Sequence, residues 1–515
     1  MTSTLVINLT RFGDLLQTQP VISALKKNGQ ATGLVCLENF ASATDLLAGV
    51  DHTFPLPGAR FLRELDESWI KTVATLFDWV DSIERQNEWG GLLNLTASLS
   101  SKMLGRLIPV EDKEGFFVDE YGFGQFSNKW AIYLEASSGV RGSSPFNLVD
   151  VFLRVAGIND HQPEYVLNRP DMDMQHRLGC ILEQKKPGGC RGYIGFQLGA
   201  SADKRRWALE NFARLGRFIW ENTGLCPVLL GSAEETGLAE RYLQLTSAPA
   251  INLVGRTNLK ELAATLIHIR LLVTNDTGTM HLAAGLKVPV LAFFLATAQP
   301  WDTGPYMENA LCLEPDLDCH PCPFDNACSN NYACRKVIQP QLVFEYINEY
   351  LQSGIWPIAP KNGSRVWLTV KRRGLMDLES RCLDGEDDRS RWMRIQRRVY
   401  SAFLDDRSPE IRDLVSPSLP FMEEVRKEAE SLCSVFELLR TRGTMLLRDS
   451  RPQLRKKFMH DWHQTGIMLD NSKIFTTLSL LWKVHSQDSG QDIHDFLKVC
   501  RSYEWLLSLF GTKFE

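Results

Sequence analysis

Short apolar runs alternate with segments of helical spacing from residue 4 to residue 351. The runs that we interpret as buried strands are residues 4–9, 33–37, 90–96, 193–198, 227–230, 271–273 and 288–294. Runs of this kind, each followed by a polar turn and an amphipathic segment, are typical of parallel sheets covered by helices. We therefore predict an α/β fold with two such domains, joined by a proline-containing connector at residues 157–174.

The pattern changes after residue 351. One more apolar run spans residues 366–371, a mixed-charge region follows, and apolar positions then recur at helical spacing in residues 421–440 and 492–510. This indicates a mostly helical extension. We expect three parts: a Rossmann-like domain at residues 1–175, a second one at residues 176–352, and the extension at residues 353–515, whose role the sequence does not indicate.

Composition limits the class of protein. A chain of 515 residues is too long for one hydrophobic core. A net charge of −5, without a basic patch on an expected exposed face, argues against nucleic-acid binding. The opening MTSTLVINLT lacks the features of a signal peptide, and no run approaches the roughly 18 apolar residues of a membrane span. We expect a cytoplasmic protein with at most peripheral membrane contact.

Residues 270–294 are the stretch richest in candidate chemistry, because they indicate a strand, a polar turn, a short helix and a second strand. Asn275, Asp276 or Thr277 can cap the helix, and Gly278 lets a ligand approach the backbone. The helix start then attracts an anion. Many such units bind nothing there. However, Asp276 would repel a phosphate unless it is directed at hydroxyl groups, and a sugar nucleotide offers both groups.

Three other loops carry candidate ligand groups. Asp14 follows Gly13 after the first strand and can either cap the next helix or act on a ligand. Ser201 precedes a basic run at residues 204–206, which is either solvated surface or a match for the charge that develops on a departing diphosphate. Glu234 and the glutamate after it follow strand 227–230, where a carboxylate accepts ribose hydroxyls or favours the helix dipole.

Four cysteines are crowded into one polar segment, which we predict to be a loop over residues 312–334. Cys319, Cys322, Cys328 and Cys334 have the spacing C-x2-C-x5-C-x5-C. Thiolates can close a tetrahedral zinc or iron site, and a loop with so little apolar content needs a staple to be ordered. We expect a structural metal with His320 as a weaker candidate ligand, and free thiols are the alternative.

The run NDTGTMHLAAGLKVPVLAFF at residues 275–294 resembles the signature of the ADP-heptose:lipopolysaccharide heptosyltransferase family (glycosyltransferase family 9). The Gly-Asp and Thr-x-Pro of the opening segment and the Gly-Ala-Ser loop before the basic run resemble further motifs of that family. The resemblance covers about residues 1–351. It implies a GT-B fold, in which two Rossmann-like domains face a cleft and helix 339–351 crosses back to the first domain.

The resemblance also implies a role for each candidate. Asp14 would be the general base that takes the proton from the acceptor hydroxyl. Lys204 or Arg205 would contact the phosphates: the family's lysine lies two residues before the tryptophan, where this chain has Arg205. The candidate donor-binding residues are Ser201, Glu234, Asp276, Thr277, Gly278, Thr279 and His281. Many members carry cysteines near residues 319–334, and one protein-modifying branch uses them to bind iron.

The function implied is inverting transfer of a heptose from ADP-heptose to a hydroxyl of a lipopolysaccharide core sugar or of a protein, with no cofactor needed for the transfer. The acceptor would lie near Thr96, Ser98 and Lys102, and the enzyme would act in the cytoplasm, at the inner face of the bacterial inner membrane. The alternative is a catalytically idle member that binds nucleotide or scaffolds a partner through its extension, which could also mediate self-association.

Overall fold

The computed structural model of the chain describes residues 3–139, 142, 144–159, 163–323, 327–411, 413–449, 451–489 and 492–512. The chain divides into two compact units. The first comprises Met1–Val118 and Phe146–Gly385, and the second comprises Asp119–Pro145 and Glu386–Glu515. Apart from one short strand at residues 124–126, the strands of both sheets belong to the first unit, whereas the second unit is mostly helical. The expected α/β and helical regions are therefore both present.

The first lobe of the first unit is a parallel sheet with helices. Its strands within this unit lie in the order β3-β2-β1-β4-β5. The strands are β1 Ser3–Ile7, β2 Ala31–Leu37, β3 His52–Leu56, β4 Gly91–Asn94 and β5 Asp112–Val118; the helices are α1 Phe12–Leu16, α2 Gln19–Lys27, η1 Glu38–Leu46, α3 Gly58–Glu67, α4 Trp69–Gln86, α5 Leu99–Leu107 and α7 Leu148–Val155. The strand order reverses between β1 and β4, where ligands of such sheets bind beyond the carboxyl ends.

The second lobe is an eight-stranded sheet in the order β14-β13-β12-β11-β10-β7-β8-β9. The strands are β7 Gly192–Gln197, β8 Leu225–Leu230, β9 Ile251–Asn252, β10 Ile269–Asn275, β11 Val290–Phe293, β12 Leu311–Pro315, β13 Ser364–Arg372 and β14 Leu375–Ser380; the helices are α8 Met172–Gln184, η3 Asp203–Arg205, α9 Leu209–Thr223, η4 Ala233–Glu235, α10 Thr236–Leu245, α11 Leu259–Ile267, α12 Gly278–Gly285, α13 Pro300–Thr303, α14 Cys334–Val337 and α15 Pro340–Ser353. Here the order reverses between β7 and β10.

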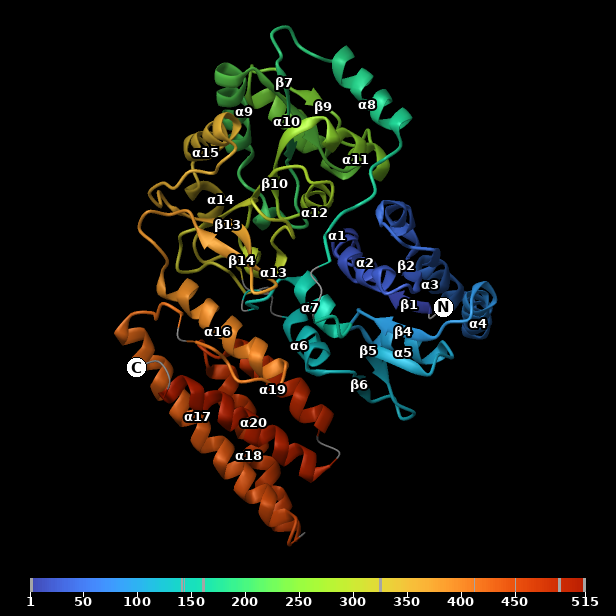
Figure 1. Cartoon of the computed structure of the whole chain (residues 1–515), viewed down its shortest axis with the longest axis vertical. Coiled ribbons are helices and arrows are strands. Elements are labelled where there is room, and N and C mark those ends of the chain that lie inside the picture. The colour runs from blue at the N-terminus through green and yellow to red at the C-terminus, as the bar shows by residue number, and fades with distance from the viewer. Residues whose placement is uncertain are drawn as a thin grey trace. The chain divides into compact units, whose positions relative to one another are not determined.

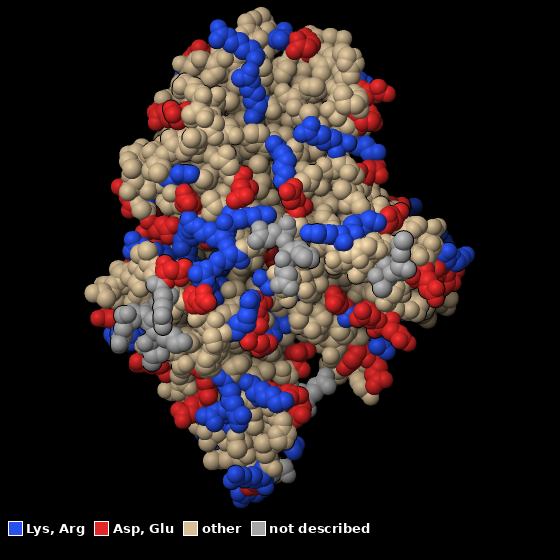
Figure 2. All heavy atoms as spheres, in the orientation of Figure 1, with Lys and Arg blue, Asp and Glu red and all other residues tan. Residues whose placement is uncertain are grey.

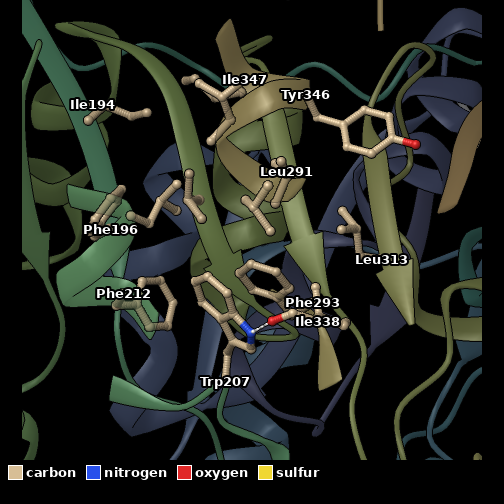
Figure 3. Packing of buried hydrophobic residues seen from close by; sticks show 14 of the residues in the cluster. Ile194, Phe196, Trp207, Phe212, Leu291, Phe293, Leu313, Ile338, Tyr346 and Ile347 are labelled. Carbon is tan, nitrogen blue, oxygen red and sulfur yellow. Dashed lines mark hydrogen bonds between the residues drawn. The ribbon is translucent and has the colours of Figure 1, made fainter. Parts of the chain in front are cut away.

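An aromatic cluster forms the core of the second lobe (Figure 3). The indole of Trp207 stacks on Phe293 at a centroid distance of 4.3 Å and meets Phe212 edge-on at 5.0 Å. Its Nε1–H donates to the Ile338 carbonyl at 3.0 Å, so the polar atom of this buried side chain is satisfied. Trp207 therefore fixes the end of the basic run to strand β11 and to the chain after the cysteine-rich segment.

Two expectations about the second lobe are corrected. Helix α15 does not cross back: Leu342, Val343 and Tyr346 pack into the core of the second lobe, because its apolar face matches that of α9. Residues 364–380 lie within the expected extension, but they form the antiparallel strands β13 and β14 at the edge of the second sheet. The first unit therefore continues to Gly385.

The second unit packs α6 Lys129–Ser138, which comes from the first part of the chain, with helices of the extension. These are α16 Asp388–Leu404, α17 Leu419–Leu446, α18 Pro452–Asn471, α19 Thr476–Asp488 and α20 Ile493–Thr512; the short strand β6 Gly124–Phe126 precedes α6. Helix α17 runs beside α18 and α20 (Figure 1). Among the described helices, we find none with the length and apolarity to cross a bilayer.

Candidate functional site

The first turns of α1 and α12 are in van der Waals contact, and this contact brings the two lobes together at their carboxyl edges. A Cβ atom on Gly13 would lie 3.1 Å from the Cα of Gly278 and 3.1 Å from Cδ2 of His281. A Cβ atom on Gly278 would lie 2.4 Å from the ring of Phe12. Glycine at both positions therefore allows Asp14, one residue further on, to lie beside the start of α12.

Gln17 lies between Asp14 and His281 and was not singled out from the sequence. Its fully buried side-chain nitrogen lies 3.4 Å from Oδ1 of Asp14 and 3.5 Å from Nε2 of His281, and it also donates to the Gly13 carbonyl at 3.3 Å. The sequence signal was a run of three polar residues, Gln17 to Gln19, within an otherwise apolar segment, and the structure buries all three. Buried polar side chains at the carboxyl edge of a sheet are expected to form hydrogen bonds with one another or with a ligand.

The start of α12 has no side-chain cap, as expected of an anion site. Thr277 occupies the N-cap position, but its side chain makes no capping bond and lies 3.3 Å from the hydroxyl of Thr274 instead. Thr279 donates to Oε1 of Gln197 at 3.1 Å, and Tyr165 donates to the carbonyl of His281 at 2.9 Å. His281 is buried, so its ring contacts protein on the side that faces Gln17.

Arg205 and Asp276 form a nearly buried ion pair, which joins two of the predicted donor-site segments. Arg205 also donates to the hydroxyl of Ser201 at 3.0 Å. Asn275 links the same segments, because its amide donates to the carbonyls of Leu198 and Gly199 at 3.0 and 3.1 Å. The structure thus gathers Ser201, Arg205 and Asp276 at the reversal between β7 and β10. Arg205 therefore contacts the signature turn directly.

Of the two glutamates after β8, the one beside this loop is Glu235 and not the predicted Glu234. The Glu235 carboxylate accepts from the amide of Gln197 at 3.1 Å and from the Ser232 N–H at 2.9 Å. It covers Gly199 so closely that a Cβ atom there would lie 1.5 Å from Oε1. Glu234 is exposed. Both residues lie in the short helix η4, so which of them faces inward depends on where that helix packs.

The hydroxyl groups of the loop after β4 accept hydrogen bonds from the backbone. Thr96 accepts from the backbone N–H of Leu9 at 2.8 Å, and Ser98 caps α5 by accepting from the N–H of Ser101 at 3.3 Å. Lys102 is buried, with its ammonium 5.7 Å from the centre of the Phe116 ring. Lys102 is therefore the one of these three acceptor-site candidates with a charge held close to the carboxyl edge of the first sheet.

The four clustered cysteines influence one another. Burial raises the pKa of the Cys322 thiol, and the neighbouring Cys319, Cys334 and Cys328 raise it further. In the described part of the segment, which leaves out residues 324–326, no three His, Cys, Asp or Glu side chains are grouped as metal ligands. The His320 side chain is buried, and its Nε2 lies 3.0 Å from the Ala298 carbonyl oxygen. The metal site remains a prediction.

The sequence was compared with known families and proteins. Residues 86–333 match the family described as Glycosyltransferase family 9 (heptosyltransferase). The chain is 29% identical over 167 residues to lipooligosaccharide heptosyltransferase 2 of Campylobacter jejuni, which is 31% of this chain and 51% of that protein. It is 29% identical over 166 residues to lipopolysaccharide heptosyltransferase 2 of Escherichia coli K12, covering 31% and 47%. The chain thus spans about half the length of these curated relatives.

Solved structures show the same fold. A glycosyl transferase family 9 structure from Veillonella parvula superposes with a TM-score of 0.56 at 18% identity, covering 68% of this chain and 97% of that one. The E. coli ADP-heptose lps heptosyltransferase II structure superposes with a TM-score of 0.52 at 18% identity, covering 69% and 100%. At this identity the likeness shows the fold alone. The predicted GT-B fold, with two α/β domains followed by a mostly helical region, is confirmed.

Proposed function

We propose that this chain, whose residues 86–333 belong to glycosyltransferase family 9, transfers a heptose from ADP-heptose to a hydroxyl of a lipopolysaccharide core sugar or of a protein, with inversion at the anomeric carbon. The observation that supports this most is the contact of Gly13 with Gly278. It puts a carboxylate, Asp14, beside a helix start whose N–H groups have no side-chain cap. A base and an anion site on facing segments are what displacement of a diphosphate by a hydroxyl needs.

In the proposed mechanism, Asp14 takes the proton of the acceptor hydroxyl as its oxygen attacks the anomeric carbon. The bond to the diphosphate breaks on the opposite face. The N–H groups at the start of α12, with Arg205 and Lys204, stabilise the negative charge that gathers on the departing ADP. Asp276 and Glu235 would accept hydroxyls of the donor, because an ionised carboxylate is a hydrogen-bond acceptor only.

Several finer points belong to the same proposal. The acceptor would bind along the carboxyl edge of the first sheet, near Lys102. We place the reaction in the cytoplasm, at the inner face of the bacterial inner membrane, and the extension would pack on the enzyme or mediate self-association. On the face shown in Figure 2, Lys and Arg are interspersed with Asp and Glu.

A structural zinc or iron at Cys319, Cys322, Cys328 and Cys334 is a separate part of the proposal. The spacing of the four cysteines supports it, whereas the described residues of the segment form no group of metal ligands. Elemental analysis of the purified chain tests it. About one zinc or iron per chain, lost in a Cys319→Ser, Cys322→Ser variant, is expected, and metal-free protein of unchanged stability would exclude it.

The alternative is an idle member that binds nucleotide or a partner without transfer. Two experiments distinguish the transferase from the idle member. Calorimetry measures the binding of ADP-heptose, with ADP-glucose, UDP-glucose and GDP-mannose as controls. Mass spectrometry measures heptose transfer to heptose-deficient lipopolysaccharide. We expect selective binding of ADP-heptose and a product one heptose heavier. Binding without transfer to sugar or protein acceptors would favour the idle member. No binding of any nucleotide sugar would overturn the transferase and leave only a member that scaffolds a partner through its extension.

A further inference from the structure

Arg335, in a part of the chain that carries no predicted donor residue, contacts the donor-site basic run directly. Its Nε–H donates to the carbonyl of Arg206 at 3.0 Å, and its NH1 group lies 2.7 Å from the carboxylate of Asp203. Its own carbonyl accepts from the N–H of Ala208 at 3.1 Å. The side chain of Arg335 therefore contacts both ends of the segment 203–206, and its backbone binds Ala208 just after that segment.

The run needs such support, because it has little regular structure of its own. Residues 203–205 form one short 3-10 turn, η3, without a side-chain cap. Asp203 also pairs with Arg206 inside the run, so its carboxylate joins Arg206 and Arg335. On the other side, the N–H of Trp207 donates to Oδ1 of Asn275 at 2.8 Å. The run is thus fixed between the signature turn and the segment that ends the cysteine-rich loop.

The position of Arg335 is fixed by the short helix that carries it. It lies in α14, the short helix that begins at the buried Cys334. Three residues later the Ile338 carbonyl accepts the indole N–H of Trp207 (Figure 3). Two contacts from the same short stretch therefore reach the run and the residue just after it. A guanidinium suits this task, because its rigid fork serves a carbonyl and a carboxylate at once, whereas lysine presents a point charge.

We propose that Arg335 is a positioning residue for the donor: it holds the Asp203–Arg206 run so that Arg205 and Lys204 face the diphosphate. This rests on the proposed function, because it assumes a nucleotide diphosphate at the start of α12. It links the end of the cysteine-rich segment to the donor site, since Arg335 directly follows Cys334. Removing the guanidinium should therefore weaken contacts to the diphosphate and leave contacts to the nucleoside unchanged.

Calorimetric titration of the full chain with ADP and, separately, with adenosine tests this. In Arg335→Ala we expect ADP affinity to fall about tenfold, the size typical of a lost charge-assisted contact, while adenosine affinity stays the same. Arg335→Lys should recover part of the ADP affinity. Lys336→Ala, which removes a neighbouring cation of the same short helix, should bind both ligands as the unaltered chain does.

A double variant sharpens the test. If Arg335 acts through Asp203, the effects of Arg335→Ala and Asp203→Ala on ADP affinity will be less than additive. Undiminished ADP affinity in Arg335→Ala overturns the inference. So does an equal loss for ADP and adenosine accompanied by a lower melting temperature, since that is the mark of a merely structural role. Failure of the unaltered chain to bind ADP would instead reject the proposed donor site.

Discussion

The second lobe and the helical unit both have a buried aromatic core, and the candidate ligand groups described above lie at one edge of the lobe. The helical unit has its own aromatic core: the ring of Phe436 meets Trp482 edge-on at 4.8 Å and stacks on Tyr503 at 5.5 Å. Some of its buried polar groups form hydrogen bonds along its helices, as where Thr465 donates to the carbonyl of Asp461 at 2.8 Å. Dense packing is therefore no guide to function.

In the second lobe, buried polar residues converge from different strands on the carboxyl edge of the sheet. Thr279 reaches Gln197, and Asn275 reaches the loop after β7, so both surround the place where the strand order reverses. Polar groups buried at such an edge point to a ligand. The comparison predicts that changes at this edge, and at the facing Asp14, alter chemistry, while changes in the helical core alter stability.

The largest effect is expected for Asp14→Asn. If Asp14 is the general base, the rate constant of transfer should fall about 10³-fold, because an amide cannot accept the proton. ADP binding should remain, since the proposed phosphate contacts lie on the second lobe. Kinetics and calorimetry on one preparation measure both, with the exposed Asp66→Asn in the same lobe as control. Retention of full activity would remove Asp14 from the mechanism.

Phe436→Ala probes the other side of the comparison. Removing this fully buried ring should lower the free energy of unfolding of the helical unit by about 4 kcal/mol, because a cavity replaces its contacts with Trp482 and Tyr503. Denaturant unfolding followed by tryptophan fluorescence measures the loss, and Leu438→Ala on the exposed face of α17 should change it little. ADP affinity should not change; if it did, the two regions would be coupled.

His485 in the helical unit should make that unit sensitive to acid. Burial, aided by Lys129, lowers the pKa of His485 from 6.5 to about 4. Below pH 6.5 His485 becomes protonated in the unfolded chain but stays neutral in the folded chain. The free energy of unfolding therefore falls by about 3 kcal/mol as the pH drops from 6.5 to about 4. Unfolding of His485→Gln across this range should show a shallower decline, and identical slopes would disprove the assignment.

Gly13→Ala tests the contact between the lobes. The added methyl group would lie 3.1 Å from the backbone of Gly278, which cannot turn aside as a side chain can. A small displacement of Asp14 from the helix start should follow, with about a 10²-fold loss of turnover. Gly58→Ala is the matched control, since a Cβ atom there meets no other atom within 4 Å. Equal turnover in both variants would show that this contact does not position the base.

The sequence by itself determined the local units. Residues 270–294 fold as expected, into β10, α12 and β11, because an apolar run, a polar turn with glycine and an alanine-rich helix are all encoded within a short stretch. The same holds for β1 with Asp14 after it, and for the helices of the extension. Short-range patterns specify which residues are buried in an element, and the resemblance of those patterns to a family supplied the architecture.

Only the tertiary structure decided which elements meet. Gln17 and His281 are 264 residues apart, Arg205 and Asp276 are 71 apart, and the periodicity of neither partner indicates the other. The choice of Glu235 over Glu234 and the membership of residues 364–380 in the second sheet depended in the same way on distant packing surfaces. Hydrophobic spacing fixes the face that an element buries, but the partner of that face is chosen by shape and by hydrogen bonds between distant segments.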